Sequence, residues 1–214
     1  MLLLFLVLIT QNIYGQSRKA SSWLLTGLEI PSYTGDLNSY AQFNNGFTLG
    51  FRLNHRENLN GQIMLMAGVI KGDNRRLDLS PGQEAPNSFF NTSLIEVSYQ
   101  LHYYLYQSEH FAFYISQGAG ILRFNPRDEF GNSLADNALS RAENENYRNI
   151  TLVLPSKIGG QYLFPNQFGI NLEAGWHNPL SDYLDNISEL GRGGSDNILF
   201  FRIGLMAPLG FKED

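Results

Sequence analysis

The sequence predicts an all-β fold, an eight-stranded up-and-down antiparallel transmembrane β-barrel. Apolar and polar residues alternate with a period of two in eight separate segments, which is typical of strands with one apolar face. The connections between these segments are alternately long and short. Only 16% of the residues are charged, against about 25% in typical soluble domains.

The composition excludes several classes of function. The chain has 214 residues, which suits one β domain. It has no Cys, so it offers no disulfide framework, thiol nucleophile or thiolate metal site. Its net charge is −5, with acidic and basic residues mixed along the chain. A nucleic-acid partner is therefore not expected, because binding to nucleic acid normally needs a basic face.

The first fifteen residues are predicted to be a signal peptide. MLLLFLVLIT is an uninterrupted apolar core that is too short to span a bilayer as a mature helix. Gly15 then supplies a small residue at the expected cleavage position. We therefore expect residues 1–15 to be removed and residues 16–214 to form one barrel domain.

The segment 93–105 shows the alternation most clearly. Its apolar face carries Ile95, Val97, Tyr99, Leu101, Tyr103 and Leu105, and its polar face carries Glu96, Ser98, Gln100, His102 and Tyr104. Successive side chains of a strand point to opposite faces, whereas a helix would mix the two sets around its circumference. The segment is therefore predicted to be a strand.

The same pattern predicts seven more strands, near residues 22–32, 47–54, 62–69, 111–123, 150–164, 168–177 and 199–211. Two residues disturb it. Gln117 falls on the apolar face of its segment. Pro155 has no N–H to donate to a ladder, so we predict a bulge there.

The lengths of the connections indicate how the barrel is oriented. Long connections are predicted at 33–45, 71–91, 124–149 and 178–197, and short turns at 55–60, 107–110 and 165–167. Outer-membrane barrels have long loops outside the cell and short turns in the periplasm. We therefore expect a protein of the cell outer membrane, surrounded by its lipid, with both termini in the periplasm.

The apolar face is predicted to meet lipid and the polar face to fill the interior. A water-facing surface would carry more Lys and Glu than the polar face does. Eight strands enclose a space that side chains can fill, and charges there need partners. The expected polar network consists of Glu29, Arg52, Glu96, His102, Lys157, Glu173 and Arg202, with His177 as a further polar residue that fills the interior.

Four short motifs carry a resemblance to a known family. PSYTGDLN follows the first strand, GxRxN lies in the second, FNP follows the fifth and SDYLDNIS follows the seventh. Together they resemble the PorG-like family of outer-membrane barrels of Bacteroidetes, over nearly all of the mature chain. The resemblance implies a component associated with type IX secretion, or a paralogue of unassigned role, and periplasmic components of the secretion complex as partners. The motif residues in the loops are Tyr33, Gly35, Asp36, Asp182, Tyr183 and Asp185.

The oxygen-rich motif after the seventh strand has two interpretations. Asp182, Asp185, Asn186 and Ser188 could bind Ca²⁺, which prefers oxygen ligands. The same residue types cap turns by bonding nearby backbone N–H groups. We favour the capping interpretation, and we expect neither a metal nor a cofactor.

No catalytic constellation is evident. Some eight-stranded outer-membrane barrels are lipid A deacylases with a His-x-Ser pair, but no His here has a Ser two residues later. Ser98 and His102 share a face but lie roughly 13 Å apart, which is too far for a hydrogen bond. We therefore expect a non-enzymatic structural anchor or component of a protein-export complex. The alternatives are a stand-alone surface barrel that binds ligands or host proteins through its loops, and a periplasmic lipocalin-like carrier.

Overall fold

The structure is a computed structural model that describes residues 20–36, 39–53, 58–73, 89–135, 144, 146–188 and 196–211. The predicted signal peptide, residues 1–15, lies outside the described residues. Among the described residues, no helix is long and apolar enough to cross a membrane.

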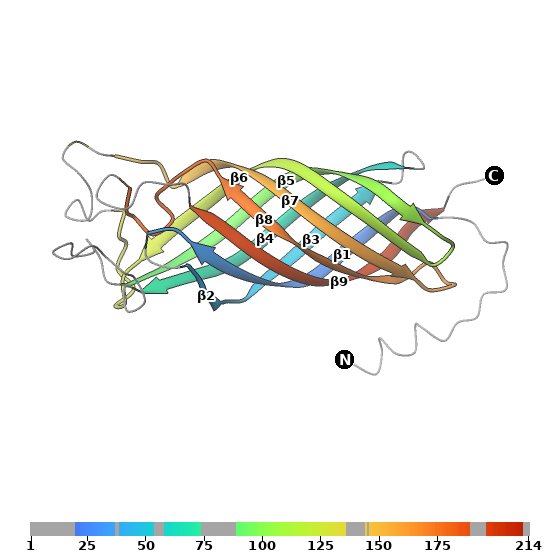
Figure 1. The fold of residues 1–214 in the computed structure, drawn as a ribbon, viewed down its shortest axis with the longest axis horizontal. Helices are drawn as coiled ribbons and strands as arrows, with labels where there is room; N and C mark the ends of the chain where they lie inside the picture. The colour runs from blue at the N-terminus through green and yellow to red at the C-terminus, as the bar shows by residue number, and fades with distance from the viewer. Residues whose placement is uncertain are drawn as a thin grey trace.

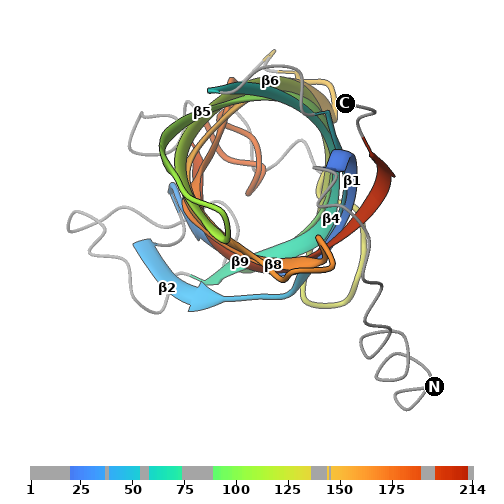
Figure 2. The same ribbon diagram turned by 90° about the vertical axis from the view of Figure 1, so that its right-hand side faces the viewer.

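The strands form a closed antiparallel barrel (Figures 1 and 2). They are β1 (Ala20–Thr34), β2 (Ser39–Phe43), β3 (Gly46–Leu53), β4 (Leu59–Asp73), β5 (Phe89–Gln107), β6 (Phe111–Arg127), β7 (Ile150–Leu163), β8 (Gly169–Pro179) and β9 (Asn197–Phe211). Each strand from β3 to β8 pairs with the next along the chain, and β9 pairs with β1 to close the wall.

The wall has eight strands because β2 and β3 occupy one position. Both pair with β1, β3 along its first part and β2 with Ser32 and Thr34 at its C-terminal end. All eight predicted segments are strands, and the predicted fold is confirmed. The first connection differs from the prediction. Residues 33–45 were expected to be a long loop, but β1 continues to Thr34 and β2 begins at Ser39. Backbone pairing extends these strands past the alternating residues, because ladder bonds do not depend on side-chain polarity.

The predicted bulge at Pro155 is wrong. The pairing of β6 with β7 reaches Gln117↔Ser156 and resumes at Gly120↔Val153 in the same register. The chain therefore accommodates the missing N–H of Pro155 by an interruption of the ladder, with no extra residue inserted.

The apolar face points outward, as the sequence predicts. Along β5, Val97 is 53% exposed whereas the neighbouring Glu96 is 0% exposed. The same contrast holds for most strands, whose outward side chains are large and apolar. This arrangement is that of a barrel surrounded by hydrocarbon. It is the reverse of a lipocalin-like carrier, which would keep the apolar face inside.

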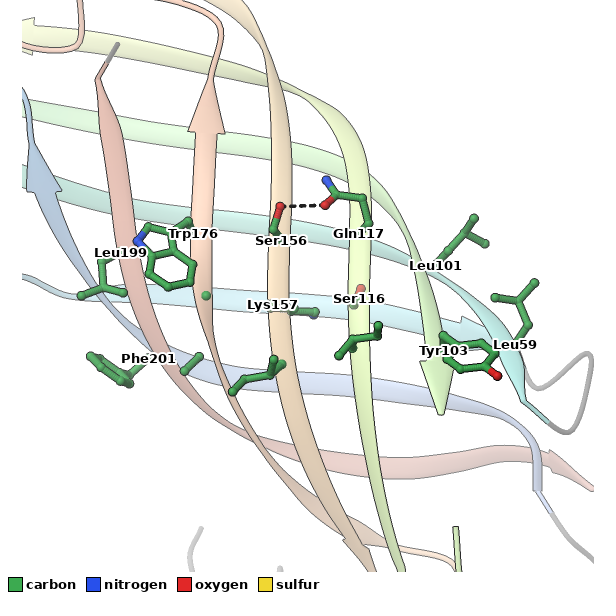
Figure 3. Close-up of a pocket in the computed structure, with 14 residues that line it drawn as sticks. Leu59, Leu101, Tyr103, Ser116, Gln117, Ser156, Lys157, Trp176, Leu199 and Phe201 are labelled. Carbon is green, nitrogen blue, oxygen red and sulfur yellow. Dashed lines mark hydrogen bonds between the residues drawn. The ribbon is translucent and has the colours of Figure 1, made fainter. Parts of the chain in front are cut away.

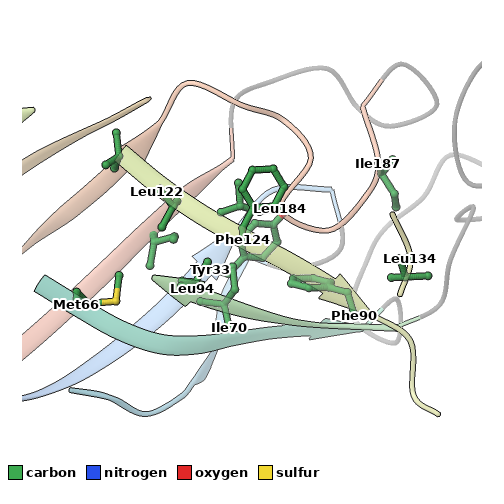
Figure 4. Packing of buried hydrophobic residues seen from close by; sticks show 12 residues of the cluster. Tyr33, Met66, Ile70, Phe90, Leu94, Leu122, Phe124, Leu134, Leu184 and Ile187 are labelled. Atoms are coloured by element: carbon green, nitrogen blue, oxygen red, sulfur yellow. The ribbon is translucent and has the colours of Figure 1, made fainter. Parts of the chain in front are cut away.

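The interior has an apolar layer that the sequence does not predict. In the half of the barrel that carries the long connections, inward side chains such as Met66, Leu94, Leu122 and Phe124 form a buried cluster (Figure 4). Leu184 and Ile187, from the connection between β8 and β9, pack into this cluster. The polar character of the inward face therefore does not extend along its whole length, because a folded-in loop covers apolar side chains at the end of the barrel that carries the long connections. A smaller cluster of Ala20, Trp23, Leu25 and Met206 lies at the opposite end.

Candidate functional site

The charged side chains of the interior converge on Glu173 in β8. Arg202 Nη1 lies 2.7 Å from Glu173 Oε2, and Lys157 Nζ lies 2.8 Å from Oε1. Tyr114 donates its hydroxyl hydrogen to Oε1 at 2.6 Å. All four groups are buried, so water does not screen these interactions. Glu173 thus connects β6, β7, β8 and β9 across the interior.

His177 joins the two remaining glutamates. Its Nε2 lies 3.1 Å from Glu29 Oε1, and its Nδ1 lies 2.6 Å from Glu96 Oε2. Imidazole carries a proton on both nitrogens only when it is charged, and that form pairs favourably with a carboxylate on each side. Arg202 also forms an ion pair with Glu29, so the network continues without a break from Glu96 to Glu173.

Arg52 is held by neutral groups as well as by charge. Its Nε donates to Gln62 Oε1 and its Nη1 to Gln161 Oε1, each at 2.7 Å. Its guanidinium carbon lies 5.1 Å from the centre of the Tyr114 ring, within the range of a cation–π interaction. Arg52 Nη2 lies 3.8 Å from Glu173 Oε1, which ties this half of the network to the other.

Every strand of the eight-stranded wall supplies a side chain to this interior network. Its members, in chain order, are Glu29, Arg52, Gln62, Glu96, Tyr104, Tyr114, Lys157, Gln161, Glu173, His177 and Arg202. With His177 charged, four cationic groups face three carboxylates. Such a network stabilises one arrangement of the wall and fills the space through which solutes would pass.

His102 takes a different place from the other predicted network residues. It is buried in the interior and lies against Tyr114, with ring centres 4.8 Å apart. Neither of its ring nitrogens has a hydrogen-bond partner among the described residues. Gln100 donates to Ser98 Oγ at 2.9 Å, on the same inward face. His102 therefore contributes packing and no bond to the network.

The motif residues of the loops meet at the mouth of the barrel that carries the long connections. The Tyr33 hydroxyl lies 2.9 Å from Asp185 Oδ2 and 2.5 Å from Asp196 Oδ1. Asp185 Oδ1 accepts the backbone N–H of Ile187, and Asp196 Oδ2 accepts that of Leu184. These four bonds fix the connection that inserts Leu184 and Ile187 into the barrel.

Asp185 and Asp196 are both buried and close together, so ionising both carboxyls at once is unfavourable. Burial, together with repulsion from the nearby Asp36 and Asp182, raises the pKa of Asp185 to about 7. Burial and the charge of Asp185 also raise the pKa of Asp196 well above its usual range. A phenol has one hydrogen to donate, so a second proton on the pair satisfies the remaining oxygen.

The other motif residues surround this pair. A Cβ atom on Gly35 would overlap the Tyr33 hydroxyl and Asp196 Oδ1, so no side chain fits there. Tyr183 stacks on Tyr147, with ring centres 4.4 Å apart. Asp185 does bond the N–H two residues on, as the capping interpretation expects, while its second oxygen faces Tyr33. No group of three or more His, Asp or Glu in the described ranges could hold a metal ion.

Three residues contribute more to the site than the sequence analysis predicted. His177 was expected only as filler, although its inward position marks it for the network. Tyr114 lies on the inward face of its strand, and that position is its only sequence signal. Asp196 directly precedes β9 and carries no signal of burial, because its environment is made by Tyr33 from the other end of the chain.

Comparisons with known proteins support the fold. No family model matches the chain, and neither does any curated protein. Ail, the attachment invasion locus protein of Yersinia pestis, matches at 13% identity over 88% of this chain and 97% of that one, with a TM-score of 0.51. Neisserial surface protein A matches at 10% identity over 89% and 98%, with a TM-score of 0.55. The chain therefore has the fold of the small eight-stranded outer-membrane barrels.

Proposed function

We propose that the protein is a non-enzymatic outer-membrane barrel that serves as a structural anchor or component of a protein-export complex of the type IX kind. The observation that carries the proposal is the filled interior. An ionic network crosses the middle of the barrel, and apolar clusters lie on either side of it. Such a barrel offers a rigid attachment to the membrane, and it offers little space for solutes.

The partner surface is the end of the barrel that carries the short turns. Ala20 of β1 pairs with Phe211 of β9, so both strand ends lie at this end. The turn 164–168 lies there too, because Trp23 Nε1 donates to Gln167 O at 3.3 Å. We assign this end to the periplasm, where the assembled machinery would reach it. The PorG-like motifs support the same assignment.

Co-purification from native membranes tests the proposal. Glu109 is exposed in the turn between β5 and β6, and Glu129 is also exposed, in the connection after β6. Glu109→Arg is expected to weaken recovery of periplasmic partners identified by mass spectrometry, whereas Glu129→Arg is the matched control. Both variants must stay in the outer-membrane fraction. If no periplasmic protein accompanies the wild type, the export role is wrong.

A second function is favoured by one outer hairpin. Phe130 is 81% exposed at its tip. Asp128 fixes the turn by accepting the N–H groups of Phe130 and Asn132 at 2.9 and 2.8 Å. A large aromatic side chain on a rigid tip suits binding of a ligand or host protein. Under this alternative, Phe130→Ser removes binding to that target and leaves periplasmic co-purification unchanged.

A further inference from the structure

Three arginines lie together on the outward wall, at the end of the barrel that carries the long connections. Arg123 and Arg127 belong to β6 and are exposed, and Arg148 is exposed just before β7. Among the residues that the structure describes, these are the only exposed arginines. We call them the arginine cluster, and the interior network includes none of them.

Strand pairing brings the arginine cluster together around Asn125. The ladder between β6 and β7 continues past Arg123, because the Phe124 N–H donates to Asn149 O at 3.0 Å. Arg148 precedes Asn149, and neighbouring strands run antiparallel. Arg148 therefore lies beside Asn125, between the two arginines of β6.

The side chain of Arg148 points to the same side as those of β6. Tyr147 stacks on the inward Phe124, with ring centres 5.8 Å apart. Successive side chains of an extended chain alternate, so Arg148 points outward. Diagonal neighbours on one face of a sheet are about 7–8 Å apart. Long side chains at that spacing can reach one group, so Arg148 can share a ligand with Arg123 or Arg127.

The arginine cluster begins where the apolar belt ends. Arg123 pairs with Ile95 of β5 and with Ile150 of β7. Both isoleucines and the neighbouring Ile121 are more than half exposed, so they belong to the lipid-facing wall. On β5 the next outward residue towards the long connections is Ser93, which is polar. This edge of an apolar belt is the height at which lipid headgroups meet a barrel.

Polar side chains elsewhere on the outward wall have partners within it. Figure 3 shows Ser156 bonded to Gln117, with its hydroxyl 2.8 Å from Oε1, and Gln117 Nε2 donates to Pro155 O at 3.2 Å. In contrast, no ion pair between described residues includes a member of the arginine cluster. Asp128 follows Arg127, but its carboxylate accepts hydrogen bonds from the residues of its own turn.

We propose that the arginine cluster binds the phosphate of a membrane lipid, whose acyl chains lie on the isoleucines beside Arg123. Guanidinium groups bind phosphate oxygens through pairs of parallel hydrogen bonds. A shared anion also offsets the repulsion between like charges on neighbouring strands. The adjoining apolar belt favours a lipid over a soluble phosphate, because a soluble anion has no chains to place there. Each arginine near an anionic membrane surface contributes about fivefold to affinity.

Native mass spectrometry of the purified full-length barrel tests the proposal. Dimyristoyl phosphatidic acid and dimyristoylglycerol compete at equal concentration, and these two probes differ only in the phosphate. The wild type is expected to retain the phosphorylated lipid preferentially. Arg123→Gln and Arg148→Gln are each expected to lower this preference about fivefold. Lys71→Gln removes the same charge from the outward face of β4, at the same end of the barrel, and is the matched control that keeps the preference.

Two further measurements complete the test. Heat-modifiable mobility on gels shows that each variant is folded, and Arg148→Gln, which lies outside the strands, decides the matter if Arg123→Gln does not fold. Glycerol 3-phosphate, at the concentration of the lipids, is expected to leave the bound lipid in place.

Four outcomes overturn the proposal. The first is equal retention of the two lipids by the wild type. The second is an unchanged preference in the folded arginine variants, and the third is an equal loss in Lys71→Gln, which would show an effect of overall charge. The fourth is displacement of the lipid by glycerol 3-phosphate, which would show a site for soluble phosphate.

Discussion

Neutralising Glu173 is the most direct test of the interior network. Glu173→Gln keeps the size of the side chain and removes one of three carboxylates. Lys157 and Arg202, at 2.8 and 2.7 Å, then lose a partner charge while they stay buried. Removing one member of a buried ion pair costs about 3–5 kcal/mol. Because Arg202 keeps Glu29, we expect a loss of about 3 kcal/mol in the free energy of unfolding.

The assay is reversible denaturant unfolding in lipid vesicles, followed by tryptophan fluorescence. Glu129→Gln removes an exposed carboxylate and is expected to change stability by no more than about 0.5 kcal/mol. Lys157→Met combined with Glu173→Gln removes both charges of one pair. The double variant should be more stable than the sum of the single losses predicts, by about 0.5–3 kcal/mol. A Glu173→Gln variant as stable as the control, or strictly additive losses, would refute the reasoning.

Three further predictions concern the outer mouth, the wall and the lumen. Because the raised pKa of Asp185 means that the folded state holds its proton more tightly, the outer plug should lose stability as pH rises from about 4 to about 7. Hydrogen exchange at the Ile187 amide measures this loss, and Asp185→Asn should reduce its pH dependence. Leu101→Arg on the outward face should cost about 2–4 kcal/mol if the residue lies near the midplane, measured by the same unfolding assay. Planar-bilayer recordings of the wild type should show no steady large conductance, because side chains fill the interior.

Each of these predictions has a contrary outcome. Protection of Ile187 that increases with pH would show that the acidic pair does not hold the plug. A Leu101→Arg variant of unchanged stability would place that side chain in water. A stable, ohmic channel would contradict the filled interior and make diffusion the leading function.

The sequence determined the wall of this barrel. Period-2 alternation located all eight strands and showed which face carries apolar side chains, because successive residues of a strand point to opposite faces. The same parity placed Glu29, Arg52 and Glu173 inside. The low content of charged residues then indicated which face meets lipid. These are local properties, so they can be read from neighbouring residues.

Only the tertiary structure decided which side chains meet across the interior. His177 lies between Glu29 and Glu96 because barrel closure brings β8 within reach of β1 and β5. Tyr33 meets Asp185 and Asp196 across 152 and 163 residues of chain. Such contacts depend on the register of every strand pair and on the inward folding of the connection between β8 and β9. Neither produces a periodic pattern in the sequence. The burial of Asp185 and Asp196, and of Leu184 and Ile187 beside them, is therefore visible only in the assembled barrel.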